Sequence, residues 1–170
     1  DHQSWLGYLQ PEGLVVSPAA LVDAQVLLDT NVSARQHQFL SFVQDVPSGE
    51  DTVPAVLNLK KLLIEFLEWP EERLQGFSAA NPIPESLKVP LRDFGETLEP
   101  TMAFVDSAPA DPERPWMLLV QELEFGIPLD VPIESQLSGW SASPTRRFER
   151  LLRESGVPIG LLANGTQLQL

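Results

Sequence analysis

The sequence predicts an α/β fold, because two helical patterns alternate with runs that have the spacing of β-strands. The stronger helical pattern spans residues 55–69, and the second spans residues 144–155. Apolar residues at helical spacing predict a helix, whereas alternation with a period of two, or a short continuous apolar run, predicts a strand. Segments of strand character lie between and after the two helices, at residues 87–92, 101–105, 115–123, 159–163 and 166–170.

The pattern over residues 55–69 predicts a largely buried helix, because a helix that is apolar on most sides packs into the interior. Its apolar residues are Leu57, Leu59, Leu62, Leu63, Ile64, Phe66 and Leu67, and Pro70 follows its end. Two shorter helical stretches precede it, at residues 19–24 and 32–43. We therefore expect residues 1–54 to form an N-terminal helical extension, packed on a core of residues 55–170.

The run at residues 116–120 predicts a central strand. It is continuously apolar, which is typical of a strand covered on both faces. Residues 87–92 alternate between apolar and polar side chains, as strands do when one face is exposed. Asn164-Gly165 predicts a type I′ hairpin between the last two strands, because that turn needs φ > 0 at both central positions.

Both ends of the helix at residues 144–155 are marked in the sequence. Ser143 and Pro144 stand at the positions preferred for an N-cap and for the first helical residue. Gly156 and Pro158 follow the last turn, where they stop a helix. The chain ends inside the strand pattern at residues 166–170 and lacks an initiator Met, so we expect it to be a piece of a longer protein.

Composition excludes several classes of function. The 170 residues include 11 Lys and Arg against 24 Asp and Glu, a net charge of −13, which argues against a general DNA-binding surface. The absence of cysteine excludes disulfides, thiolate metal sites and a cysteine nucleophile, and it fits a cytoplasmic location. No apolar run reaches the ~18–20 residues of a membrane helix, so we expect no membrane partner.

The two histidines do not suggest a catalytic site. His2 lies at the N-terminus, and His37 lies in a helix beside Arg35 and Gln36, as surface histidines often do. Neither has a nearby nucleophile of the kind that a catalytic histidine serves. Glycine-rich phosphate-binding loops are absent as well. Any catalytic chemistry therefore has to rest on carboxylates.

Glu122 and Glu124 are the best-placed carboxylates in the sequence. They lie two positions apart at the end of the predicted central strand, so that both side chains can point to one face and converge on a metal ion. Asp106 or Glu99 could add a third oxygen ligand. The alternative is that the two glutamates only mark the solvated end of the strand.

Four of the 11 basic residues lie on the helix at residues 144–155: Arg146, Arg147, Arg150 and Arg153. With Glu149 and Glu154 the helix has a charge of +2, which leaves −15 for the rest of the chain. Arg146, Arg150 and Arg153 share one helical face. The set of four arginines is either part of a solvated surface with internal ion pairs or a contact for phosphate or an acidic partner.

The order of these elements resembles the restriction endonuclease-like fold of the PD-(D/E)xK nuclease superfamily, whose core is αβββαβ with a mixed sheet. The resemblance covers residues 55–170. Residues 147–165, which include GVPIGLLANG, are similar to the helix–strand–turn of N-terminal domains in type I restriction subunits. Residues 87–100, which include GETLEP, resemble the N-terminal region of bacterial proteins that combine restriction with an adenine-specific DNA methyltransferase.

Carried over residue by residue, the resemblance implies that the catalytic positions are replaced. Thr101 stands where the family has Asp, Gln121 where it has Glu or Asp, and Leu123 where it has Lys. Because Thr and Gln are poor ligands for Mg²⁺ and Leu cannot orient a nucleophile, we expect a domain without nuclease activity and without a cofactor. It would act as a scaffold, or as a contact for DNA or a partner, at the N-terminus of a restriction–modification or phage-defence methyltransferase, with the rest of that chain as its partner.

Two alternatives stay open at this point. In the first, the domain is an active Mg²⁺-dependent endonuclease whose site has migrated to other carboxylates, namely Glu65, Glu68, Asp106, Glu122 and Glu124. In the second, it is an acidic protein-interaction domain with no role in nucleic-acid binding, which the strongly negative charge supports.

Overall fold

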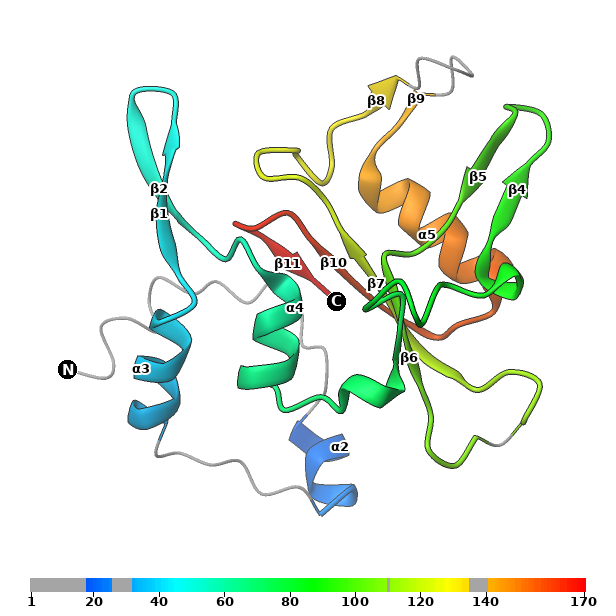
Figure 1. Cartoon of the computed structure of the whole chain (residues 1–170), viewed down its shortest axis with the longest axis horizontal. Coiled ribbons are helices and arrows are strands. Elements are labelled where there is room, and N and C mark those ends of the chain that lie inside the picture. The colour runs from blue at the N-terminus through cyan, green and yellow to red at the C-terminus, as the bar shows by residue number, and fades with distance from the viewer. Residues whose placement is uncertain (1–17, 26–31, 110, 135–140) are drawn as a thin grey trace. The chain divides into compact units, whose positions relative to one another are not determined.

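The computed structural model describes residues 18–25, 32–109, 111–134 and 141–170 (Figure 1). The chain divides into two compact units, residues 1–35 and 36–170. The described part of the first unit contains helix α2 (Pro18–Asp23), and helix α3 (Ser33–Leu40) spans the boundary. Both helices were predicted. Ser17-Pro18 also has the sequence of an N-cap and a first helical residue, but Ser17 lies outside the described residues.

A five-stranded mixed sheet forms the centre of the second unit, which confirms the α/β prediction. Its order is β11-β10-β7-β6-β3, with β10 parallel to β7 and all other neighbours antiparallel. The strands are β3 (Leu74–Gln75), β6 (Met102–Val105), β7 (Trp116–Glu122), β10 (Ile159–Ala163) and β11 (Leu168–Gln169). As predicted, β7 is a central strand with three consecutive buried residues, Leu118, Leu119 and Val120.

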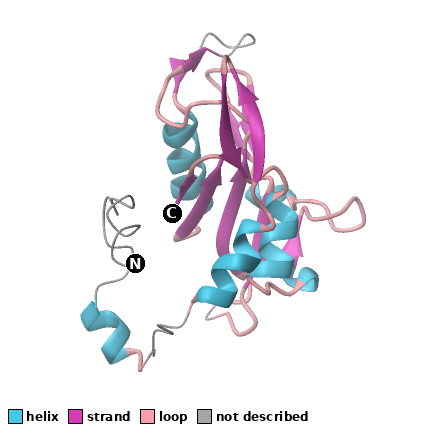
Figure 2. Ribbon diagram, turned by 90° about the vertical axis from the view of Figure 1, so that its left-hand side faces the viewer, coloured by secondary structure: helices cyan, strands magenta, loops and turns pink. Residues whose placement is uncertain are grey.

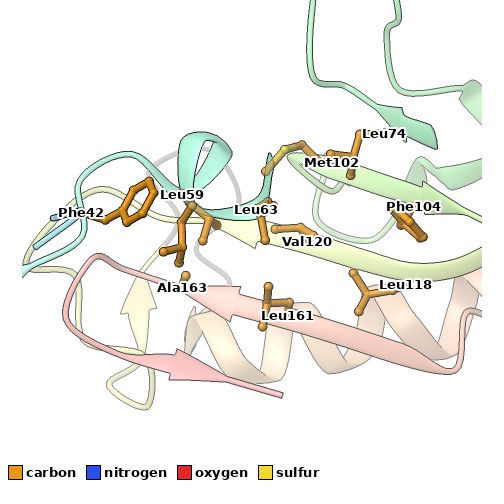
Figure 3. Close-up of a cluster of buried hydrophobic side chains, with 11 residues drawn as sticks. Phe42, Leu59, Leu63, Leu74, Met102, Phe104, Leu118, Val120, Leu161 and Ala163 are labelled. Carbon is orange, nitrogen blue, oxygen red and sulfur yellow. The ribbon is translucent and has the colours of Figure 1, made fainter. Parts of the chain in front are cut away.

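Helical segments cover both faces of the sheet (Figure 2). Successive side chains of a strand point to opposite faces, so Leu118 and Val120 pack with Leu59 and Leu63 on one side (Figure 3). The same packing includes Phe42, Leu62, Leu74, Met102, Phe104, Leu161 and Ala163. Leu119 and Leu162 point the other way, into a second cluster with Phe148 and Leu151 of helix α5 (Pro144–Ser155).

Helix α5 begins and ends as the sequence predicts. The Ser143 hydroxyl accepts a hydrogen bond from the Arg146 amide at 3.3 Å, and Pro144 occupies the first turn. Gly156 ends the helix in the left-handed conformation, at φ +71°, which costs glycine little. Gly160 of β10 allows the helix to approach the sheet closely, since a Cβ there would lie 2.6 Å from Phe148 and Leu152 side-chain atoms.

The helix predicted at residues 55–69 is much shorter and less regular than expected. Helix α4 spans only Leu59–Lys61 and continues as a π-helix, η1 (Leu62–Phe66). Asn58 sets the start, because its side-chain oxygen accepts a hydrogen bond from the Lys61 amide at 2.8 Å, the usual role of Asn at an N-cap. Residues before it belong to a hairpin of β1 (Gln44–Ser48) and β2 (Asp51–Ala55), so the predicted extension at residues 1–54 is not helical over its last part.

The strand predicted at residues 87–92 forms, but outside the central sheet. There β4 (Val89–Leu91) follows the 3-10 turn η3 (Glu85–Leu87) and pairs only with β5 (Glu96–Leu98). Leu87, Leu91 and Leu98 are buried in the cluster around α5, and this packing holds the hairpin against the helix. The place beside β6 is taken instead by the two-residue strand β3, which follows the 3-10 turn η2 (Glu71–Arg73).

The turn at Asn164-Gly165 connects β10 and β11 as predicted, but its loop is longer. Ala163 pairs with Leu168, which leaves four residues in the loop instead of two. The buried Asn164 side chain explains this, because its Oδ1 accepts hydrogen bonds from the amides of Thr166 and Gln167 at 3.1 and 2.8 Å. An Asn side chain that bonds its own backbone in this way forms an Asx-turn.

A further two-stranded sheet joins β8 (Ile133–Glu134) to β9 (Ser141–Ala142), just before α5. Among the described residues, no helix is both long enough and apolar enough to cross a membrane.

Candidate functional site

The candidate site lies where β6 begins and β7 ends, and it brings Thr101 and Gln121 together. The Thr101 amide donates to the Val120 carbonyl at 2.9 Å, which fixes the two strand ends side by side. The Gln121 Nε2 donates to the Thr101 hydroxyl at 3.3 Å. The Glu122 amide donates to the same hydroxyl at 3.0 Å. The two positions where the resemblance implies carboxylates are therefore adjacent, and they hold a neutral, hydrogen-bonded pair.

Leu123, the third position of that set, follows directly after β7. Its amide donates to the Ala163 carbonyl at 2.7 Å, and its half-buried side chain packs against the cluster around α5. The leucine side chain contributes to packing and has no group that donates or accepts a hydrogen bond. The side chains at positions 101, 121 and 123 therefore provide one hydroxyl and one amide as their polar groups.

An open cleft of about 640 Å³ lies beside Thr101 and Gln121. Lys60 of α4, Lys88 before β4 and Glu99 after β5 contribute its charged side chains. The remainder of the wall comes from Gly76, Phe77, Ser78, Ala79, Pro82, Ile83 and Pro100. Elements that are far apart in the sequence thus meet at one end of the sheet.

The two lysines of the cleft are held differently. The Lys60 ammonium donates to the Phe77 carbonyl at 3.2 Å and lies 5.7 Å from the centroid of the Phe77 ring. The Lys88 ammonium contacts Glu85 at 2.5 Å and Glu99 at 3.8 Å. The hydrogen bond that Lys88 donates to the Glu85 carboxylate is the main cause that raises the pKa of Lys88 above its ordinary value of 10.5, so this lysine is protonated at neutral pH.

The carboxylates of the migrated-site alternative are spread over the fold. Asp106 follows the last residue of β6, beside the start of β7, and its side chain accepts a hydrogen bond from the Ala108 amide at 3.0 Å. Glu122 ends β7. Six residue steps along that strand, at about 3.3 Å each, separate the two ends by ~20 Å, so Asp106 and Glu122 lie at opposite ends of the sheet.

The other three members of that set lie at the surface. Glu65 is exposed and lies 3.7 Å from Lys61, and Glu68 and Glu124 are exposed. Glu122 is half-buried and lines a separate cavity with Leu59, Leu62 and Asn164. Within residues 18–25, 32–109, 111–134 and 141–170, no group of three or more His, Cys, Asp or Glu side chains could hold a metal ion.

No protein-family model, curated protein or solved structure matches this chain.

The four arginines of α5 separate into two groups. Arg147 is turned toward the β4–β5 hairpin, where its guanidinium contacts Glu96 at 2.6 Å, with side-chain exposures of 21% and 19%. Arg146 and Arg153 are exposed, and Arg150 lies 3.7 Å from Glu154, an ion pair that the sequence predicts. Arg147 therefore joins two elements, and the other three remain on the outer side of the helix.

Sequence reasoning missed the lysines of the cleft as site residues. Lys60 belongs to a pattern that only indicates a helix, and Lys88 to one that only indicates a strand. The two lysines are too far apart in the sequence to form a local motif. They line one cleft only because the turn at Gly76, the η3 turn and the end of β5 fold together there. The one hint in the sequence is that these are two of only three lysines in the chain.

Proposed function

We propose that this chain is a non-catalytic nuclease-like domain that serves as a scaffold, or as a contact for DNA or a partner protein. The observation that carries the proposal is the hydrogen-bonded pair of Thr101 and Gln121 at the adjoining ends of β6 and β7. In a restriction endonuclease-like domain these two strand ends would present the metal-binding carboxylates. Here the same place holds two neutral side chains.

The arrangement of the elements supports this proposal. In chain order, the segments α4, β3, β6, β7, α5 and β10 follow the αβββαβ sequence of that fold. The strands β3, β6 and β7 are antiparallel neighbours, and β10 returns parallel to β7 after helix α5. The first strand of this core would be β3, and the β4–β5 hairpin would be an insertion after it.

The absence of cutting follows from the chemistry of the side chains. Phosphodiester hydrolysis by such an enzyme uses Mg²⁺ to activate water and to stabilise charge on the phosphate. Mg²⁺ prefers carboxylate oxygens and water as ligands, and neither Thr101 nor Gln121 has a carboxylate. Leu123 has no amine to replace the lysine that assists the reaction.

We further propose that the domain stands at the N-terminus of a bacterial cytoplasmic restriction–modification or phage-defence methyltransferase, whose remaining chain is its partner. Arg146, Arg150 and Arg153 on the outer side of α5 are the residues that would contact phosphate or an acidic partner. Because the rest of the chain has a charge of −15, we expect its affinity for free DNA to be low and steeply dependent on salt.

A plasmid-cleavage assay with Mg²⁺ or Mn²⁺ tests the proposal. We expect the purified domain to leave supercoiled plasmid intact at every metal concentration. Metal-dependent nicking that Glu122→Ala abolishes, while the matched exposed change Glu124→Ala preserves it, would overturn the proposal in favour of an active site built on Glu122. Nicking that both variants retain would point to a contaminating nuclease. In that case we expect further purification of the domain to leave the plasmid intact.

A further inference from the structure

The cleft beside Thr101 and Gln121 has two lysines and one glutamate among its lining residues, so its wall has a small positive charge in an acidic protein. Lys60 and Lys88 come from separate elements, and they are two of only three lysines in a chain with a net charge of −13. A cleft with charged walls attracts ligands of the opposite sign, because low-dielectric surroundings focus the field. The ligand favoured by this cleft is therefore an anion.

Lys60 provides the strongest reason for that conclusion. It is half-buried, and its charged group donates to a neutral carbonyl, that of Phe77, at 3.2 Å. Among the residues that the structure describes, no carboxylate lies within 4.0 Å of the Lys60 ammonium. An ammonium has three donors, so this one keeps N–H groups and an uncompensated charge for a ligand. Partial burial of a charge without an opposite charge beside it costs free energy, and a bound anion would offset that cost.

Neutral donors complete the site. The Gln121 amide nitrogen uses one of its two N–H groups on the Thr101 hydroxyl and retains the other. Ser78 lines the same cleft with a further hydroxyl. Phosphate groups are bound by this combination of Lys with Ser, Thr and Gln side chains, and such contacts depend little on the rest of the ligand.

We propose that this cleft binds a phosphate group through Lys60 and Lys88, with Gln121 and Ser78 as neutral donors. The source of the phosphate is the backbone of a nucleic acid; this choice rests on the proposed function, whereas the phosphate chemistry does not. Glu99 limits the site, because its carboxylate lines the cleft and lies 3.8 Å from the Lys88 ammonium. Glu85, at 2.5 Å from the same ammonium, and Glu99 both compete with a bound anion for Lys88, so Lys60 is the main cationic contact.

Titration with inorganic phosphate, followed by amide chemical shifts at constant ionic strength and in the presence of EDTA, tests the site itself. We expect saturable shifts around the cleft in the wild-type domain, and about tenfold weaker binding in Lys60→Gln, the loss typical of one charge-assisted hydrogen bond. Lys61→Gln is the matched control, since Lys61 is on the same helix but contacts Glu65 and the Phe42 ring. We expect it to change the affinity less than twofold.

A second variant makes the test independent of any loss of folding. Glu99→Gln removes the competing carboxylate without changing its size, so we expect phosphate to bind several-fold more tightly. The inference is wrong if phosphate causes no saturable shifts, if Lys60→Gln and Lys61→Gln weaken binding equally, or if Glu99→Gln weakens it. Acetate titrated at the same ionic strength should bind clearly more weakly; equal binding would overturn the assignment to phosphate.

A short fluorescein-labelled DNA duplex separates this inference from the proposed function. Fluorescence anisotropy should show duplex binding that both Lys60→Gln and Arg153→Gln weaken. If duplex binding needs Arg153 but not Lys60, and phosphate binding is not saturable, the inference that the cleft binds phosphate is wrong. The proposed function is then unaffected. If phosphate binding is saturable but the duplex does not bind, the cleft is a phosphate site whose phosphate does not come from nucleic acid. This result would also count against a role of the domain in DNA contact.

Discussion

The two faces of the central sheet are covered by helices of very different regularity. Helix α5 spans 12 residues, with a serine cap at its start and a left-handed glycine at its end. On the opposite face, α4 has three residues and continues as a five-residue π-helix. Irregular helical turns of this kind are frequent at functional sites, and α4 is the segment that contributes Lys60 to the cleft. The comparison suggests that α5 mainly stabilises the fold, whereas α4 also positions the site.

The largest expected effect is a loss of stability that is equal on the two faces of the sheet, because each face covers fully buried leucines. Leu63 and Leu119 are both fully buried, the first on the π-helix η1 and the second on β7 under α5. Truncating a buried leucine to alanine costs about 3 kcal/mol through lost transfer energy and the remaining cavity. We expect Leu63→Ala and Leu119→Ala each to lower the free energy of unfolding by that amount in urea titrations. A loss under 1 kcal/mol for Leu63→Ala alone would show that the π-helical segment is not docked on the sheet.

The next effect is specific to the α5 face. In Gly160→Ala the added methyl group would lie 2.6 Å from side-chain atoms of Phe148 and Leu152, and overpacking of this kind costs about 2 kcal/mol. We expect thermal unfolding at a lower temperature, and partial recovery when Leu152→Ala makes room for the methyl group. Additive losses in the double variant would contradict this close approach, because residues in contact show coupling.

Comparing the two helix caps then separates stability from binding. Ser143→Ala and Asn58→Ala each remove a side chain that accepts a hydrogen bond from the first turn of a helix, at a cost of about 1 kcal/mol. We expect both variants to lose stability in urea, but only Asn58→Ala to weaken phosphate binding, because Asn58 begins the helix that holds Lys60. An equal loss of binding in the two variants would show that the cleft depends on overall stability.

The smallest expected effect is a change in the pKa of the Lys88 ammonium. Its pKa is raised mainly by the hydrogen bond that its ammonium donates to the Glu85 carboxylate. A raised pKa in the folded state stabilises the fold at pH values below 10.5, and this contribution is lost as the pH rises through the folded-state pKa. An NMR pH titration of the Lys88 side chain should show a pKa above 10.5 in the wild type, with a lower value in Glu85→Gln. An unchanged value in the variant would contradict the contact.

Local patterns predict those parts of the fold whose signals lie close together in the sequence. Helix α5 follows from Ser143, Pro144 and Gly156, and the buried centre of β7 from the apolar run at residues 116–120. Thr101 and Gln121 follow from the resemblance, and the structure brings them together. Whether they mark a lost nuclease site stays a prediction.

Tertiary packing decides the parts that the sequence does not predict. Strand β3 has two residues, too few for any periodic pattern, so the alternating residues 87–92 were assigned to the sheet in its place. The buried Asn164 side chain lengthens the turn after β10 through hydrogen bonds that no dipeptide rule contains. The cleft depends on Lys60 and Lys88, whose proximity exists only in the folded chain.

The central claim is that the ends of β6 and β7 are arranged as a metal site but lack its ligands. Calorimetric titration with Mn²⁺ of the wild type and of the double variant Thr101→Asp/Gln121→Glu tests it directly. We expect no specific Mn²⁺ binding in the wild type, and one new site in the double variant, because the two side chains are already within hydrogen-bonding distance. Stoichiometric binding to the wild type that Glu122→Ala removes, or a double variant that folds but binds no Mn²⁺, would contradict the claim.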